Sequence, residues 1–233
     1  MTERKRALPV ITVETTGMEN YDAGAEKAYL SLFRRFAVEK HPVVPGRIGV
    51  LGVNPLDTSD LTAGDMLRGL LPGAVCYGMG TTLEDVQAAA SAEENLVIAP
   101  SGIKTAVYLE DRFGTPWKAF DPLASALVPE VDFSGKRILL VHQQVTANSI
   151  RQILKQRGAD SVVCATWFMQ KEALKQPGDQ ILREEDDLTA LVREGKFDIL
   201  MGDAVLWRML PDFPGITVDL PQFPVSGRLR GDV

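Results

Sequence analysis

The sequence predicts an α/β protein with two Rossmann-like domains, each a doubly wound and mainly parallel sheet, preceded by an N-terminal connector helix. Short apolar runs alternate with segments of helical spacing along most of the chain, which is typical of βαβ units. A turn-rich segment at 121–135 interrupts this alternation, and 233 residues suffice for two small domains. We therefore expect a connector over residues 1–46, a first domain over 47–130 and a second domain over 131–233.

The connector opens with an apolar segment at 8–15, which is predicted as a short strand or an extended lead-in, and continues through a glycine-containing loop. Ala28, Leu32 and Phe36 recur every four residues, which predicts an amphipathic helix from 25 to 39. Pro42 and Pro45 then impose extended geometry and separate this helix from the first domain.

The first domain is predicted to contain three strands and three helices. Its strands are expected at 47–53, 74–77 and 95–99, its helices at 61–70, 81–93 and 101–114, and a short extended piece at 116–120. The helix at 81–93 carries a capping-box pattern, with Thr81 or Thr82 as the N-cap and Glu84 or Asp85 in the first turn.

The second domain repeats the same alternation. Strands are expected at 136–142, 160–168 and 197–202, helices at 145–158 and 186–195, a short helix at 203–210 and a last extended piece at 215–220. The polar segment 170–187 has no clear periodicity, and it is predicted to connect a strand to a helix.

The composition excludes some classes of function. The net charge of −6 and the pI near 5.1 disfavour non-specific binding to nucleic acid, which requires a basic surface. No apolar run approaches the roughly 20 residues that span a bilayer, and Glu14 interrupts the apolar stretch near the N-terminus. We expect no membrane association and a cytoplasmic location.

The cysteines predict no metal site formed by this chain alone. Cys76 and Cys164 are far apart, lie within apolar strand runs and belong to no CxxC spacing. Free cysteine in such a run packs as a small hydrophobic residue. A disulfide framework and a zinc or iron site are therefore not expected.

Candidate binding residues follow the predicted strands, because ligands of open parallel sheets bind at the carboxyl ends of the strands. Asn54, Ser101, Gly102 and His142 hold such positions and are our candidate cofactor-binding residues. Ser101 and Gly102 fit either close approach of a bound group or a capped helix start. His142 fits either a proton donor or a hydrogen-bonded structural residue. No catalytic residue is identified.

Two further strand-end positions favour structural roles. Gly78 and Gly80 form a G-x-G turn before a helix, but Leu83 stands where a dinucleotide fingerprint has its third glycine, so a tight turn is preferred over a phosphate site. Asp203 follows Gly202 and is predicted to cap the next helix.

Seven segments occur in an order that resembles nitrogenase component 1-type oxidoreductases and cover nearly the whole chain. They are "LPVITVETTGMENYDAGAEKA", "RIGVLGVNPLD", "GTTLEDV", "NLVIAPSGIKTAVYLEDRFGTPW", "GKRILLVH", "FDILMGD" and "FPGITVDLPQF". The resemblance implies the second and third Rossmann-like domains of a family subunit. The first, cluster-binding domain has no counterpart in the sequence.

The resemblance also implies partners and chemistry. Family subunits pair with a homologous subunit, hold an iron–sulfur or related metal cluster or a tetrapyrrole between domains, and take electrons from an ATP-dependent iron–sulfur reductase. A homodimer is another expected arrangement. In the catalytic nitrogenase subunit, the segment that resembles "NLVIAPSG" carries a cysteine that binds the active-site cluster. Ala99 occupies that position in this chain. This chain alone is thus expected to bind no cluster and to be inactive.

Two alternatives to an oxidoreductase subunit remain open. One is a non-catalytic carrier or assembly scaffold that holds a cluster precursor or a tetrapyrrole between the domains. The other is a sugar-nucleotide or periplasmic-type binding module, which would predict a secretion signal or a clear phosphate turn. Neither feature is found in the sequence.

Overall fold

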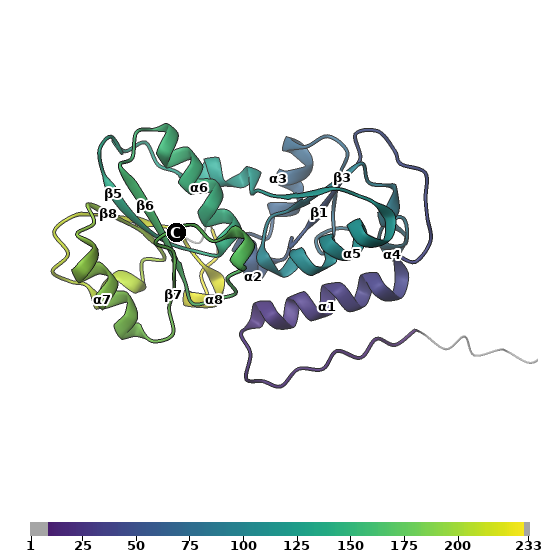
Figure 1. The fold of residues 1–233 in the computed structure, drawn as a ribbon, viewed down its shortest axis with the longest axis horizontal. Helices are drawn as coiled ribbons and strands as arrows, with labels where there is room; N and C mark the ends of the chain where they lie inside the picture. The colour runs from purple at the N-terminus through teal and green to yellow at the C-terminus, as the bar shows by residue number, and fades with distance from the viewer. Residues whose placement is uncertain (1–8, 231–233) are drawn as a thin grey trace, which may run out of the picture.

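The computed structural model describes residues 9–230 and shows two lobes, each built around a parallel sheet (Figure 1). Sheet A has the strand order β2-β1-β3-β4 and sheet B the order β7-β6-β5-β8-β9. All strand pairs are parallel in both sheets. The predicted α/β class with two parallel-sheet domains is confirmed.

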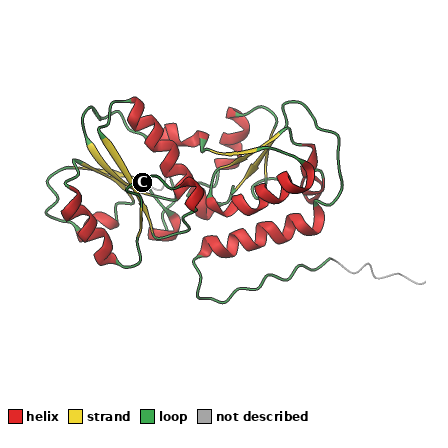
Figure 2. Cartoon of the chain, viewed as in Figure 1, coloured by secondary structure: helices red, strands yellow, loops and turns green. Residues whose placement is uncertain are grey.

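The strands of sheet A alternate with short helices (Figure 2). The elements are β1 (Ile48–Leu51), α2 (Pro55–Thr58), α3 (Ala63–Leu70), β2 (Ala74–Cys76), α4 (Leu83–Gln87), β3 (Glu94–Val97), α5 (Ile103–Phe113) and β4 (Trp117–Ala119). The 3₁₀ turn η2 (Pro100–Gly102) links β3 to α5.

Apolar side chains of sheet A point alternately to two faces, and each face has its own core. On one face Leu51 and Val97 pack with Phe33 of α1 and Leu109 of α5. On the opposite face the strands pack against α3 and the 3₁₀ turn η3 (Pro122–Leu127). Burying both faces of a parallel sheet produces the continuous apolar strand runs seen in the sequence.

Sheet B belongs to the second lobe. Its elements are β5 (Arg137–Val141), α6 (Gln144–Gln156), β6 (Ser161–Thr166), β7 (Gln180–Ile181), α7 (Glu185–Gly195), β8 (Ile199–Gly202), β9 (Ile216–Asp219) and α8 (Phe223–Ser226). Leu140 and Met201 face a core that contains Ile150 of α6, whereas Leu139 and Leu200 face a core that contains Leu188 of α7.

Helix α1 (Tyr21–Phe36) lies against sheet A beside α5 (Figure 1). The helix predicted at 25–39 thus begins four residues earlier and ends three residues earlier. Asn20 adopts extended backbone geometry directly before the helix, and Asp22 lies in the first turn, where a carboxylate complements the helix dipole. The helix ends at Ala37, whose ψ of 69° leaves the helical region.

Other predicted boundaries differ from the structure at short elements. The helix expected at 81–93 is divided into α4 and a 3₁₀ turn at Ala89–Ser91, and its capping box consists of Thr82 and Asp85. The prediction of a helix at 203–210 is wrong, because this segment forms a 3₁₀ turn at Leu206–Met209 and no α-helix. Pro211 disfavours helical geometry at Leu210, so the segment before it is too short for a helix.

Several short elements were not predicted. They are α2, β7 and α8, each of two to four residues. Elements of this length carry too few residues to show a period. The segment 8–15 was predicted as a strand or an extended lead-in; residue 8 lies outside the described residues, and residues 9–15 form no strand. Within the described chain, no helix combines the length and apolar character required to cross a bilayer.

Candidate functional site

The strand order reverses between β1 and β3 in sheet A and between β5 and β8 in sheet B. Crevices at such points are the usual ligand sites of open parallel sheets. In this protein the two points meet, because Gln143 Nε2, just after β5, donates a hydrogen bond to Ile98 O, just after β3, at 2.8 Å. We call this contact region between the strand ends of the two lobes the seam.

A buried carboxylate, Asp57, organises the first lobe's side of the seam. Asn54 follows β1 and caps α2, with its Oδ1 accepting from Asp57 N at 3.1 Å. Ser101 Oγ donates to one Asp57 oxygen at 2.8 Å, and Tyr21 of α1 donates to the other at 2.8 Å. Burial raises the pKa of Asp57, although hydrogen bonds from Ser101, Tyr21 and Asn54 act in the opposite direction. The Asp57 cluster joins three segments that are distant in sequence.

Gly102 is required by the close approach of two backbones. A Cβ at Gly102 would lie 2.9 Å from Gly52 N and from Leu51 atoms, so no larger residue fits without displacement. Gly52 has a φ of +82°, and its own Cβ position would lie 2.8 Å from Ala99 N. The turns after β1 and β3 therefore pack directly on each other, and Ala99, Ser101 and Gly102 are buried.

His142 lies on the second lobe's side and is only 1% exposed. Neither of its ring nitrogens has a hydrogen-bond partner among the described residues. Burial lowers the pKa of His142 to about 3, and the nearby Arg230 charge acts in the same direction, while a contact with the Gln143 backbone and the Asp203 charge oppose it. At neutral pH the ring is uncharged, with one donor and one acceptor nitrogen unused.

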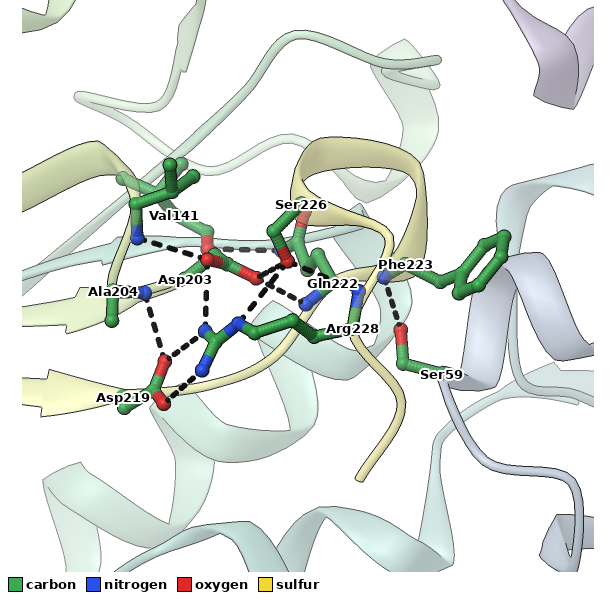
Figure 3. Close-up of polar contacts among 10 residues, drawn as sticks. Ser59, Val141, Asp203, Ala204, Asp219, Gln222, Phe223, Ser226 and Arg228 are labelled. Atoms are coloured by element: carbon green, nitrogen blue, oxygen red, sulfur yellow. Dashed lines mark hydrogen bonds and ion pairs between the residues drawn. The ribbon is translucent and has the colours of Figure 1, made fainter. Parts of the chain in front are cut away.

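The C-terminal segment crosses the seam and clamps the two lobes (Figure 3). Asp203 accepts hydrogen bonds from Gln222 N at 2.9 Å and from Ser226 Oγ at 2.6 Å. Arg228 Nη2 lies 2.9 Å from the same carboxylate. Ser59 of the first lobe accepts from Phe223 N at 2.8 Å through its hydroxyl oxygen. We call residues 219–230 the C-terminal clamp.

Burial opposes ionisation of Asp203, but its hydrogen bonds prevail. Those from Ser226, Gln222 N, Val205 N and Arg228 hold the pKa of the carboxyl below its usual value. Asp203 is therefore a carboxylate at neutral pH. It was predicted to cap a helix, and it does accept from Val205 N at 3.0 Å, but its other bonds hold the clamp.

Helix α1 also connects the two lobes, through buried carboxylates on its first two turns. Asp22 accepts a hydrogen bond from Met169 N, which belongs to the second lobe. Glu26 is 3% exposed and forms ion pairs with Lys171 of the second lobe at 2.6 Å and with Lys104 of α5 at 2.7 Å. The connector helix thus contacts both lobes and fixes their relative position.

The donor atoms at the seam do not fit a metal cluster of the kind that the sequence resemblance implies. Ala99 has no donor side chain, and Cys76 and Cys164 are buried in different lobes as free thiols. Burial raises the pKa of Cys164 to about 12, so this thiol does not ionise readily. Within residues 9–230, no group of three or more His, Cys, Asp or Glu side chains is placed to hold a metal ion.

A separate cavity lies beside α1, at the carboxyl ends of β1 and β2. Its volume is about 590 Å³, and we call it the α1 cavity. Its walls are uncharged and come from four parts of the chain: Ile11, Val13, Ala28, Tyr29, Leu32, Asn54, Tyr77, Gly78, Thr81, Thr82, Leu83 and Val86. Gly78 belongs to the G-x-G turn, so this turn borders an apolar space.

The structure brings together three of the four residues predicted for binding. Asn54 and Ser101 share Asp57, and Gly102 follows Ser101 in the same buried turn. His142 belongs to the opposite lobe and forms no hydrogen bond with them. Asn54 also borders the α1 cavity.

The sequence did not reveal the hydrogen bonds that fix the candidate residues and the C-terminal clamp at the seam. Asp57 follows the first predicted strand of the first lobe and is spaced for a polar helix start, but this spacing does not predict its bond to Ser101. Tyr21 and Arg228 reach the seam from segments 36 and 25 residues away from their carboxylate partners, and no local pattern marks them.

Comparisons with known proteins agree with this geometry. Over residues 1–128 the sequence matches the family of nitrogenase component 1 type oxidoreductases. The fold resembles nitrogenase Cp1 solved at pH 5, with a TM-score of 0.60, 16% identity and coverage of 88% of this chain and 57% of that one. It also resembles nitrogenase Cp1 solved at pH 6.5, with a TM-score of 0.57, 13% identity and coverage of 88% and 59%.

This chain therefore spans less than two thirds of each nitrogenase chain. No curated protein matches it in sequence. The family match covers more than half of the chain, and the two structures share its fold. The chain belongs to the nitrogenase component 1-type oxidoreductase family.

Proposed function

We propose that this chain is the two-domain part of a nitrogenase component 1-like oxidoreductase subunit that acts with a homologous paired subunit and an ATP-dependent iron–sulfur reductase. The family match supports this role, and so does the meeting of both strand-order reversals at one seam. In parallel α/β sheets this is where a substrate or redox group binds.

In this proposal the metal ligands come from outside the described residues. The observation that carries it is the donor set at the seam, where Ala99 is an alanine and both cysteines are buried elsewhere. An iron–sulfur cluster requires several thiolates, and a tetrapyrrole substrate requires a source of electrons. This chain then contributes the protein surface that encloses the bound cluster or tetrapyrrole and the contacts to the paired subunit. Alone, it is inactive.

The test is anaerobic purification of the natural full-length protein together with its paired subunit. We expect iron, acid-labile sulfide and electron uptake that depends on both the reductase and ATP. Omitting ATP is the matched control, and it should abolish electron uptake while the metal content stays unchanged. An intact pair that lacks iron and sulfide and accepts no electrons would contradict the proposal.

The second candidate function is a non-catalytic carrier or assembly scaffold. It is compatible with the same donor set, because holding a tetrapyrrole does not require a three-residue metal-ligating group, and none is placed among residues 9–230. In this case a tetrapyrrole or cluster precursor binds to the pair, and its absorption spectrum does not change when reductase and ATP are added. A reductase-dependent spectral change would exclude the scaffold.

We also propose the domain limits 47–130 and 131–233, because sheet A lies within the first range and sheet B within the second. The connector is proposed to span residues 1–46, with α1 as its helix. A cytoplasmic location is proposed from the two free, buried cysteines.

A further inference from the structure

The segment at 9–17 has backbone groups without partners. It runs lengthwise beside α1 at the edge of the first lobe (Figure 1). No backbone hydrogen bond joins these residues to any other described residue, and the one local bond is from Met18 N to Thr16 Oγ1. We call residues 9–17 the N-terminal strap.

Side chains of the strap alternate between two directions. Ile11 and Val13 are half-buried and line the α1 cavity, whereas Thr12 and Glu14 are exposed and Val10 is 82% exposed. Alternation with a period of two is the pattern of a strand that rests one face on an apolar surface. Its four consecutive residues from Val10 to Val13 are all β-branched, which favours strand geometry.

The chemistry of this surface indicates which kind of partner fits it. An unpaired row of N–H and C=O groups is a template for pairing with another strand. Ile11 and Val13 of the strap line the uncharged α1 cavity, so an apolar surface supports the strap with which an incoming strand would pair. A helix would leave the strap's backbone groups unpaired.

We propose that the occupant is the same strap of a second copy of this chain, paired antiparallel about a two-fold axis at Thr12. This register places Thr12 opposite Thr12, Ile11 opposite Val13, and Val10 opposite Glu14. Thr–Thr and aliphatic cross-strand pairs are favourable, and no two like charges face each other. Two-fold pairing of one patch with itself is the commonest symmetry of homo-oligomers.

The proposed ladder is short. Pro9 has no N–H group and ends it on one side, and the symmetric register then limits pairing to residues 10–14. Two-stranded ribbons of this length are marginal unless an apolar surface supports them. We therefore expect a weak, concentration-dependent dimer with a dissociation constant on the order of 10–100 µM.

Sedimentation velocity on the full chain, from about 1 µM to about 1 mM, measures this equilibrium. Hydrogen exchange of residues 9–17, read by mass spectrometry, should slow as the concentration rises. Thr12→Pro and Val13→Pro each remove one N–H group, and because neighbouring N–H groups of a strand point to opposite edges, one variant should weaken the dimer at least about tenfold and the other less.

Thr15→Val is the matched control, because residue 15 is exposed and lies outside the 10–14 ladder, and it should dimerise like the parent. Both proline variants should fold, since the strap has no native backbone bond to lose, and circular dichroism verifies this. A monomer at every concentration overturns the proposal. So does a dimer that neither proline affects, or strap protection that does not depend on concentration. These measurements require neither iron nor reductase, so they are independent of the proposed redox role.

Discussion

Arg228 binds Asp203 at 2.9 Å, and this pair joins the end of the chain to the strand-order reversal of the second lobe (Figure 3). Arg228 also binds Asp219 with both terminal nitrogens, at 2.7 and 2.9 Å. The fully buried Asp203 carboxylate thus depends on groups from the C-terminal clamp. The clamp in turn reaches Ser59 of the first lobe, so one ion pair influences the contact between lobes.

Removing the arginine should destabilise the protein moderately. In Arg228→Met, Asp203 keeps its bonds from Ser226 and Gln222 N but loses its ion pair with Arg228, so we expect a loss of about 1–2 kcal/mol, limited because Arg228 is partly exposed. The free energy of unfolding in urea measures this.

The matched control is Arg157→Met, whose partner Glu130 has a 93% exposed side chain. This control should stay within about 0.5 kcal/mol of the parent. Equal effects of the two substitutions would show that the Asp203 pair does not hold the clamp.

His142 should make the protein sensitive to acid. Its pKa is lowered to about 3 by burial, so the folded state binds fewer protons than the unfolded state, in which the pKa is near 6.5. The stability contributed by neutral His142 is therefore complete above pH 6.5 and falls as the pH decreases toward 3. Between pH 7 and pH 4 this amounts to about 3 kcal/mol.

Comparison with His142→Leu isolates this contribution. The variant removes the titrating ring, and we expect its unfolding free energy to fall less than that of the parent between pH 7 and pH 4, by roughly 2–3 kcal/mol. Urea unfolding at both pH values gives the difference. Parallel pH profiles would mean that His142 protonates without disturbing the fold.

The Asp57 cluster should show energetic coupling between Asp57 and Ser101. Ser101→Ala removes one donor and should cost about 1 kcal/mol, whereas Asp57→Asn turns an acceptor into a donor opposite Ser101 or Tyr21 and should cost about 1–3 kcal/mol. The double variant should cost less than the sum, because both changes break one shared bond. Additive losses would show that the bond contributes nothing.

The same cluster has a predictable pH dependence. The pKa of Asp57 is raised above its usual 3.8, so ionisation disfavours the folded state. Its contribution is complete below 3.8 and decreases as the pH rises toward the raised value. The difference in unfolding free energy between the parent and Asp57→Asn should therefore shrink between pH 4 and pH 7. A difference in unfolding free energy that stays constant over this range would contradict the raised pKa of Asp57.

Gly102→Ala should strongly destabilise the seam. Its new methyl group would lie 2.9 Å from Gly52 N, which is backbone and cannot rotate away, so we expect a loss of about 2–4 kcal/mol. Gly69→Ala is the control, because this helical position in α3 has open space around it and should gain up to about 1 kcal/mol. Thermal unfolding of both variants measures the contrast.

The local pattern of the chain determined the elements of regular length and their order. Apolar runs such as residues 138–141 and 199–202 can be buried on both faces only in a parallel sheet with helices on each side, so the class and the two lobes followed from the sequence. Elements of two to four residues, such as β7 and α8, could not be predicted, because so few residues show no hydrophobic period.

Only the tertiary structure decided how the candidate residues are used. The positions of Ser101 and His142 after strands were evident from the sequence, but the Asp57 bond to Ser101 and the buried, unpartnered ring of His142 were not. Hydrogen bonds between residues distant in sequence depend on how strand ends meet across two lobes. No local spacing encodes that meeting, because it arises from the packing of whole sheets and of α1 against both lobes.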